Sequence, residues 1–120
     1  MENIFFTLNE NEQYLKKQFS SGKELVIRRF FIKDIECMIA YVLGLNNVQN
    51  ISNFILKPAF EYTGEIDKNK GVLDELINKV CLVSEVVQEV SYSTIISELM
   101  KGKCALFVNN EAKALILAVD

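Results

Sequence analysis

The sequence contains no histidine. Without an imidazole, the chain cannot form the Ser-His or Cys-His pairs that activate a nucleophile, nor the usual imidazole zinc sites. It also has no G-x-G-x-x-G and no G-x-x-x-x-G-K-[ST] pattern, so neither a dinucleotide fingerprint nor a phosphate-binding P-loop is indicated. The missing histidine removes a large share of hydrolase chemistry, and a free-standing cytosolic enzyme of α/β type is only a remote alternative.

Cysteine is scarce. The chain has only Cys37, Cys81 and Cys104, which lie far apart in the sequence and form no C-x-x-C pair. With no cleavable signal pattern at the N-terminus, this indicates a reducing compartment and structural free thiols. The longest run free of charge and strong polarity, Cys37 to Leu45, is about half of the ~20 residues that a membrane-spanning helix needs. No spanning segment is therefore expected within these residues.

An excess of positive charge is also lacking, since 13 basic residues stand against 16 acidic ones and the formal net charge is -3. Both signs are spread along the chain without a basic stripe, which argues against nucleic acid as a partner. Half of the residues are hydrophobic, and there is only one proline. This composition at 120 residues predicts a single ordered domain with its own core.

The front of the chain is predicted to form a helix followed by a β-hairpin. Residues 8–19 carry apolar side chains near one face of a helix, Asn9 and Glu12 resemble an N-cap pair, and "SSG" ends the helix. The apolar runs at 24–32 and 35–45 are rich in β-branched and aromatic residues and flank a polar "KD" turn, which indicates a hairpin. Arg28 and Arg29 must point to opposite faces of the first strand, so at least one lies near a sheet edge or pairs with a carboxylate.

The middle of the chain is predicted to be mainly helical. A helix containing Ile51 and Ile55 should end near Lys57, with a second short turn starting at Pro58, because proline is not tolerated in a helix interior. A solvated loop and an amphipathic helix over 72–80 should follow. Residues 81–90 are ambiguous between helix and strand, and a strand is favoured for the second half. Ser91 is the expected N-cap of a helix that ends at Gly102.

The chain ends in two short apolar runs, Cys104 to Val108 and Ala114 to Val119, on either side of "NNEAK". Each run is too short to span a membrane, and the asparagines can supply the positive φ that a hairpin loop needs. Both alternating faces of these strands are apolar, which predicts central strands covered by helices on both sides. The expected fold is α/β (α+β), with a small mixed sheet of two hairpins plus a short strand, flanked by about four helices.

Few residues suggest chemistry, and each has a simpler structural interpretation. Asp67 to Gly71 resembles the start of a calcium loop, but its glycine comes one position early and Asn78 replaces the bidentate glutamate. Glu85 and Glu89 could act as paired carboxylates or form a solvated face. The remaining candidates are an arginine pair that could clamp an anion or form ion pairs, and aromatic residues that could stack a ligand or fill the core. They are Arg28, Arg29, Phe30, Phe31, Tyr41 and Phe107.

Several blocks in a fixed order carry a family likeness: "YLKKQF", "ELVIRRF", "IAYVLGL", "FILKPAF", "VSEV" and "ISELMKGKCALFVNNEAKALIL". With these blocks, the chain resembles the N-terminal soluble region of the A subunit of GerA-type spore germinant receptors, over roughly 9–120. Family members commonly carry Asp-Gly in the last hairpin turn, where this chain has Asn109 and Asn110. Since asparagine also tolerates the left-handed region, the turn remains feasible.

The resemblance implies a cytosolic N-terminal region of two small α/β subdomains, followed by a membrane-spanning region. Residues 1–120 would be the first subdomain. Its implied location is the cytoplasmic side of the spore inner membrane. Its implied partners are a permease-like B subunit, a lipoprotein C subunit and other A subunits. The resemblance further implies that the A subunits assemble into an oligomeric, ligand-gated ion channel.

The leading hypothesis is a non-enzymatic receptor module that contributes to receptor assembly or signal transmission in spore germination. The alternative is a module that binds a small-molecule germinant together with the second subdomain, since ligand sites favour domain interfaces. No catalytic, cofactor-binding or metal-binding residue is assigned and no cofactor is expected. The ligand-binding residues, if any, are left open.

Overall fold

The computed structural model describes residues 2–19, 24–45, 48–62, 64–65, 71, 74–75 and 85–118. Its strands are β1 Leu25–Ile32, β2 Ile35–Val42, β3 Glu85–Glu89, β4 Cys104–Val108 and β5 Ala114–Ala118. Its helices are α1 Leu8–Gln18, α2 Val48–Ile51, the π-helix η1 Ser52–Leu56, α3 Lys57–Glu61 and α5 Tyr92–Met100. The expected helix over 72–80 and the calcium-like loop lie largely outside the described residues.

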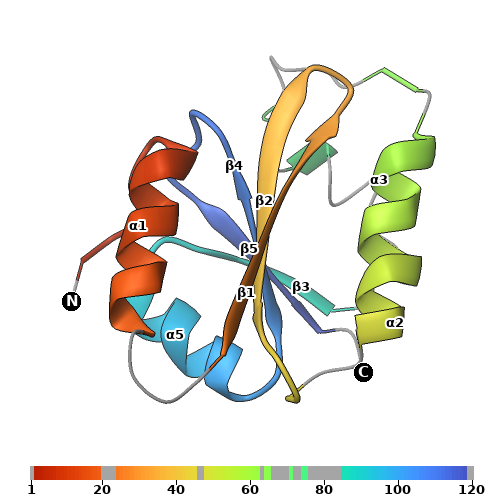
Figure 1. Ribbon diagram of the computed structural model, residues 1–120. Helices are drawn as coiled ribbons and strands as arrows, with labels where there is room; N and C mark the ends of the chain where they lie inside the picture. Colours follow the sequence, from red (N-terminus) through yellow and green to blue (C-terminus); the bar gives the residue numbers. More distant parts are fainter. Residues whose placement is uncertain are drawn as a thin grey trace.

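The strands form one sheet in the order β1-β2-β4-β5-β3 (Figure 1). The expected α+β class, with two hairpins, a short strand and flanking helices, is confirmed. The sheet differs from the expected mixed one, because every pairing is antiparallel. The connection between β2 and β3 carries the chain to the far edge of the sheet, where β3 pairs with β5 and runs antiparallel to it.

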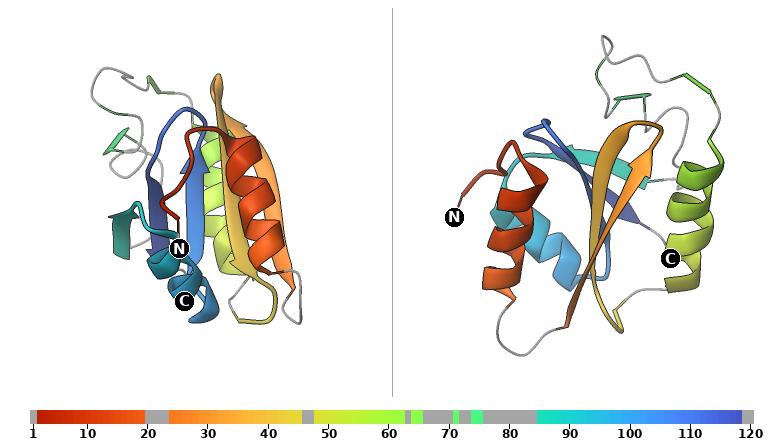
Figure 2. Two further views of the ribbon diagram at one scale, coloured as in Figure 1. Left: turned by 90° about the vertical axis from the view of Figure 1, so that its left-hand side faces the viewer. Right: turned by 45° about the horizontal axis from the view of Figure 1, so that its top comes forward.

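Helices cover both faces of the sheet, with α1 and α5 on one face and α2, η1 and α3 on the other (Figures 1 and 2). Side chains alternate along each strand, so the central strands supply a core cluster to each side. Ile39 and Leu106 face the α2 side, whereas Met38 and Phe107 face the α1 side. All residues of β4 are buried, which confirms the expectation of central strands covered on both sides.

Both hairpins have the turns that the sequence predicts. Lys33 adopts a φ of 59° between β1 and β2, and Asn110 a φ of 67° between β4 and β5. The register of the first hairpin opposes Ile32 to Ile35 across a two-residue loop. Asparagine tolerates this left-handed region, so Asn110 can adopt the positive φ that the turn between β4 and β5 requires.

The expected cap of α1 is wrong by two positions. Thr7, not Asn9, is the N-cap, and its hydroxyl oxygen accepts a hydrogen bond from the Glu10 N–H at 3.3 Å. The same hydroxyl donates to the Glu10 carboxylate at 2.9 Å. Asn9 instead lies in the first turn of α1, where its side-chain oxygen accepts a hydrogen bond from the Arg29 guanidinium at 2.7 Å.

The expected break at Pro58 is also wrong, because helical structure runs from α2 through η1 into α3 without interruption. A proline lacks an N–H and its ring crowds the carbonyl four residues earlier. Here the π-helical turn directly before it widens the backbone, and the Lys57 N–H donates to the Ser52 carbonyl instead. The widened turn therefore accommodates Pro58 near the start of α3.

The later elements follow the prediction. β3 occupies the second half of the ambiguous segment, and Ser91 is the N-cap of α5. The Ser91 hydroxyl makes no capping hydrogen bond to the helix and lies 3.1 Å from the Ser93 hydroxyl. Gly102 follows α5 with a φ of +96°, as expected for a helix stop.

Candidate functional site

The two arginines of β1 lie on opposite faces, as the alternation predicts. On the α1 side, the Arg29 guanidinium donates to Glu12 at 2.9 Å, to Glu36 at 3.2 Å and to Asn9 at 2.7 Å. Lys16 binds the second oxygen of Glu12 at 2.7 Å. Hydrogen bonds from Lys16 and then Arg29 hold the pKa of Glu12 below its ordinary value. Arg29 therefore joins α1 to the first hairpin and is not available to clamp a ligand.

Arg28 lies on the α2 side and is exposed. Together with Arg29, Phe30, Leu56 and Phe60 it lines a shallow cavity of about 200 Å³. Phe60 is 69% exposed, and its ring centre lies 6.5 Å from that of Phe30. This cavity is thus bordered by three apolar side chains and two arginines, of which Arg29 is paired with Glu12 and Glu36.

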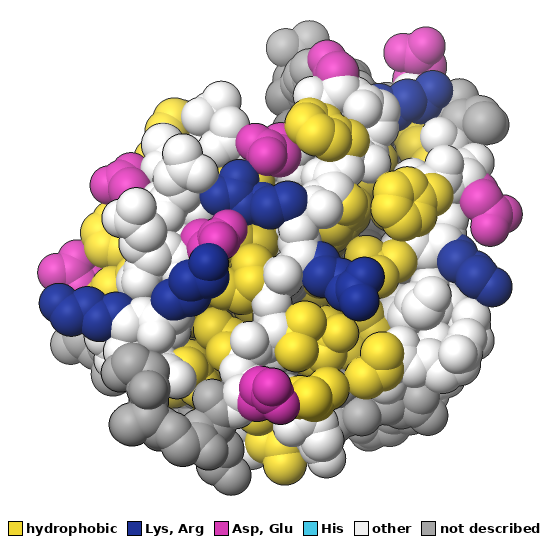
Figure 3. Space-filling view, in the orientation of Figure 1, with side chains coloured by type: hydrophobic (Ala, Val, Ile, Leu, Met, Phe, Trp, Pro, Cys, Tyr) yellow, Lys and Arg dark blue, Asp and Glu magenta, His cyan; other side chains and the backbone are white. Residues whose placement is uncertain are grey.

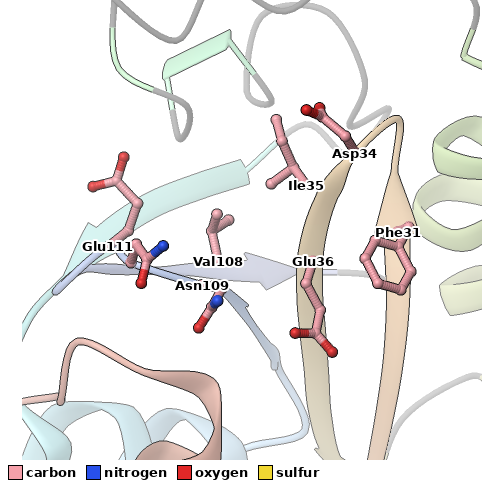
Figure 4. Close-up of a pocket in the computed structure, with 8 residues that line it drawn as sticks. Phe31, Asp34, Ile35, Glu36, Val108, Asn109 and Glu111 are labelled. Carbon is pink, nitrogen blue, oxygen red and sulfur yellow. The ribbon is translucent and has the colours of Figure 1, made fainter.

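A larger cleft of about 410 Å³ lies at the end of the sheet where the two hairpin turns meet. Figure 4 shows its lining from β1, β2 and the β4–β5 turn. Ile35 and Val108 are buried beneath it, and Phe31 is 57% exposed at its side. The polar lining consists of three carboxylates and two amides: Asp34, Glu36, Glu111, Asn109 and Asn110.

The two asparagines of the cleft are hydrogen-bonded to the N-terminal segment. The Asn109 side-chain oxygen accepts from the Leu8 N–H at 3.1 Å, and its backbone N–H donates to the Glu36 carbonyl at 3.0 Å. The Asn110 N–H donates to the Phe6 carbonyl at 2.9 Å. These bonds fix the second turn against the start of α1, so this side of the cleft is rigid.

The carboxylates of the cleft do not converge. Figure 4 shows those of Asp34 and Glu111 pointing to one side, while Glu36 points the opposite way, toward its partner Arg29. Carboxylates in this arrangement can attract a cation or an ammonium group, but they do not form an acid/base pair around one point. Within the described ranges, no three side chains of metal-ligating type lie close enough to hold an ion.

The other residues that the sequence suggested for chemistry are buried in the core or paired with neighbouring groups, except Phe31. Phe30, Tyr41 and Phe107 are buried in the core, whereas Phe31 borders the cleft. Glu85 pairs with Lys103 at 3.5 Å. Glu89 accepts from the backbone N–H groups that follow it, at 2.9 and 3.1 Å. The two glutamates on β3 therefore have separate partners.

Cys37 and Cys104 are buried free thiols, as expected, and burial raises the pKa of Cys104 to about 12. Cys81 lies outside the described residues. None of the described helices is long and apolar enough to cross a membrane.

The sequence prediction missed the cleft, although it identified both turns that line it. The sequence pattern places Asp34 and Asn109 only in turns, and nothing in it shows that two turns so far apart in the chain lie at the same end of the sheet. The pairing of β2 with β4, which opposes Cys37 to Val108, does so. The sequence feature that could have indicated the cleft is the presence of polar and acidic residues in both turns.

Comparison with known proteins finds similarity to spore germination proteins. The family model described as Bacillus/Clostridium GerA spore germination protein matches residues 13–120. Spore germination protein KA of Bacillus subtilis (strain 168) is 25% identical over 117 residues, which are 95% of this chain and 21% of that protein. The chain therefore spans about a fifth of this curated relative's length.

A solved structure shares the fold. It is the crystal structure of the N-terminal domain of the A subunit of the Bacillus megaterium spore germinant receptor GerK3. The TM-score is 0.72 at 18% sequence identity, and the match covers 98% of this chain and 48% of that chain. At this identity the likeness shows the fold alone, over about half of the solved domain.

Proposed function

The chain belongs to the Bacillus/Clostridium GerA spore germination protein family, and on this basis we propose that it is an N-terminal module of a spore germinant receptor A subunit. The family expected from the sequence blocks is confirmed. The observation that carries the proposal is the family match over 13–120, because this range includes all five strands of the sheet.

In this proposal, residues 1–120 form the first of two N-terminal subdomains. The chain covers 48% of the GerK3 domain, which leaves room there for a second unit of similar size. The module works on the cytoplasmic side of the spore inner membrane. Its partners are a permease-like B subunit, a lipoprotein C subunit and other A subunits.

The proposed role is non-enzymatic and consists in receptor assembly or the transmission of a conformational change. Two features support it. The charged side chains that could carry chemistry hold elements together, as Arg29 does with Glu12 and Glu36. The sheet is packed by a separate core cluster on each face, so a displacement of one helical layer is carried to the other through a rigid sheet.

The test is germination of spores in which the gene is deleted and then restored. Deletion should abolish the response to at least one nutrient germinant, measured as loss of optical density, while a receptor-independent trigger still works. The restored protein should fractionate with the spore membrane. Normal responses of the deletion spores to every nutrient would contradict the proposal.

A second candidate function is the binding of a small germinant, and the cleft at the hairpin turns favours it. Its volume of about 410 Å³ falls in the usual range for small-molecule sites, and its carboxylates suit the ammonium group of an amino acid. Because these carboxylates diverge, this chain would supply only part of the site, and the second subdomain would supply the rest.

Substitution of the cleft separates the two functions. Glu111→Gln removes a charge that has no structural partner among the described residues, and Glu61→Gln, at an exposed position on α3, is a surface control of equal charge change. Under the assembly role, spores with either variant should respond alike. A raised germinant requirement for Glu111→Gln alone would favour binding, and amide shifts at Asn110 and Glu111 during an amino-acid titration of both subdomains would locate it.

A further inference from the structure

β1 is an edge strand of eight residues, and among the described strands it pairs with β2 alone. The Glu24 carbonyl accepts from the Leu43 N–H at 2.9 Å, in the same register that opposes Leu25 to Val42. Bonded and non-bonded pairs alternate in an antiparallel ladder. The backbone N–H and C=O groups of the odd-numbered residues from Leu25 to Phe31 therefore point away from β2.

No described segment pairs with this outer side. The sheet order ends at β1, and Figure 2 (left) shows no described element alongside its free side. A long open edge presents a row of backbone donors and acceptors that another strand can use, and proteins commonly shield such edges with proline, bulges or charge. β1 has no proline, and its hairpin register runs without a bulge from Leu25 to Ile32.

The side chains around the edge are mainly apolar. In the space-filling view of this face, apolar groups surface along both sides of β1 and are interrupted by basic and acidic groups (Figure 3). Phe31 is 57% exposed at one side and Phe60 is 69% exposed at the other. The 200 Å³ cavity between Phe30, Leu56 and Phe60 opens beside the strand.

The two arginines of β1 differ in whether a carboxylate pairs with them. Arg29 is neutralised by Glu12 and Glu36. Arg28, on the opposite face, has no carboxylate partner among the residues that the structure describes, and it borders the apolar cavity. A strand added at this edge would therefore meet one unneutralised cation next to one apolar hollow.

We propose that β1 is a docking edge for an extended segment of a partner protein, with a large apolar residue and an acidic residue two positions apart. In an antiparallel addition, the apolar side chain lies opposite Phe30 and enters the cavity. The acidic side chain, two residues later, lies opposite Arg28 on the same face. The backbone bonds give affinity and these two side chains give selectivity.

A second copy of this chain fits less well through the same strand, because the charged residues of β1 are both arginines. Pairing of β1 with β1 offers no carboxylate for Arg28. A partner segment of opposite charge does, and it is also attracted before contact.

The probe is the acetylated, amidated peptide Thr-Leu-Thr-Glu-Thr-Val-Thr, with a second peptide that has Lys in place of Glu. Each is titrated into the isotope-labelled 120-residue chain and followed by amide chemical shifts and hydrogen exchange. The acidic peptide should change the chemical shifts of the odd-numbered backbone amides from Leu25 to Phe31 and slow their hydrogen exchange. The Lys peptide should bind about five- to ten-fold more weakly, because a like charge then faces Arg28.

A charge exchange completes the test. Arg28→Glu should weaken the acidic peptide about five- to ten-fold and favour the Lys peptide by a similar factor. Lys113→Glu changes the net charge equally on a distant loop and should leave both affinities within about two-fold. Circular dichroism and the dispersion of the amide spectrum show that each variant is folded.

Three results would overturn the proposal. The first is an absence of shifts with either peptide at millimolar concentration. The second is equal binding of both peptides, or shifts away from β1. The third is concentration-dependent shifts of the β1 amides in the chain alone, which would assign the edge to a second copy.

Discussion

Gly102→Ala is expected to destabilise the domain strongly, because this glycine meets two separate constraints. Its φ of +96° is rarely adopted by residues with a side chain. An added Cβ would also lie inside van der Waals contact with the backbone carbonyl oxygen of Leu45, and 3.3 Å from the carbonyl carbon. The obstacle is backbone, which cannot rotate away as a flexible side chain would.

The magnitude follows from these two parts. A left-handed backbone costs an alanine about 1–2 kcal/mol. Moving the loop at Leu45 by the missing separation disturbs its bond to the Val42 carbonyl, now 3.3 Å long, and adds about 1–3 kcal/mol. The unfolding free energy should therefore fall by about 2–5 kcal/mol.

Gly44→Ala is the matched control. Gly44 has a φ of +87°, but an added Cβ would meet no atom within 4 Å. It should cost only the backbone part, about 1–2 kcal/mol. Urea denaturation of both variants measures the difference. Equal losses for the two variants would refute the argument from the contact with Leu45.

Two further predictions concern groups around α1. Asn11→Ala removes the acceptor of the Phe5 N–H (2.8 Å) and of the buried Tyr92 hydroxyl (2.6 Å), so it should cost about 2–5 kcal/mol. Urea denaturation measures this, and Tyr92→Phe in the Asn11→Ala background should recover part of the loss; no recovery would contradict the role of the hydroxyl. Glu12 has a pKa lowered by Lys16 and Arg29, so its stabilisation is present above the ordinary value of 4.5 and lost as the pH falls through the folded value. Glu12→Gln should therefore flatten the decline of stability between about pH 5 and pH 3, and superimposable pH profiles of the two proteins would show this reasoning to be wrong.

The sequence predicted the hairpins well because their signals are local. β1 and β2 are rich in β-branched and aromatic residues on either side of a two-residue polar turn, and the short apolar runs at the C-terminus flank two asparagines. Full burial of β4 was also foreseeable, since both of its faces are apolar. Such patterns depend on side-chain periodicity, which each segment carries by itself.

The errors arose where one position was interpreted without its neighbours. Pro58 predicted a break, but the π-turn before it removes the conflict with the helix. Asn9 resembled a cap, yet Thr7 fills that role and leaves Asn9 for Arg29. The mixed sheet was expected from the order of elements, which does not specify the edge that β3 joins.

The sequence by itself determined the class of fold, the positions of most elements, the buried strands and the family. These depend on composition, periodicity and ordered blocks along the chain. Only the tertiary structure decided which strand is an edge, which arginine is neutralised and which turns meet to form a cleft. Each of these depends on contacts between segments far apart in the chain, such as β2 with β4, and no local pattern encodes the choice among them.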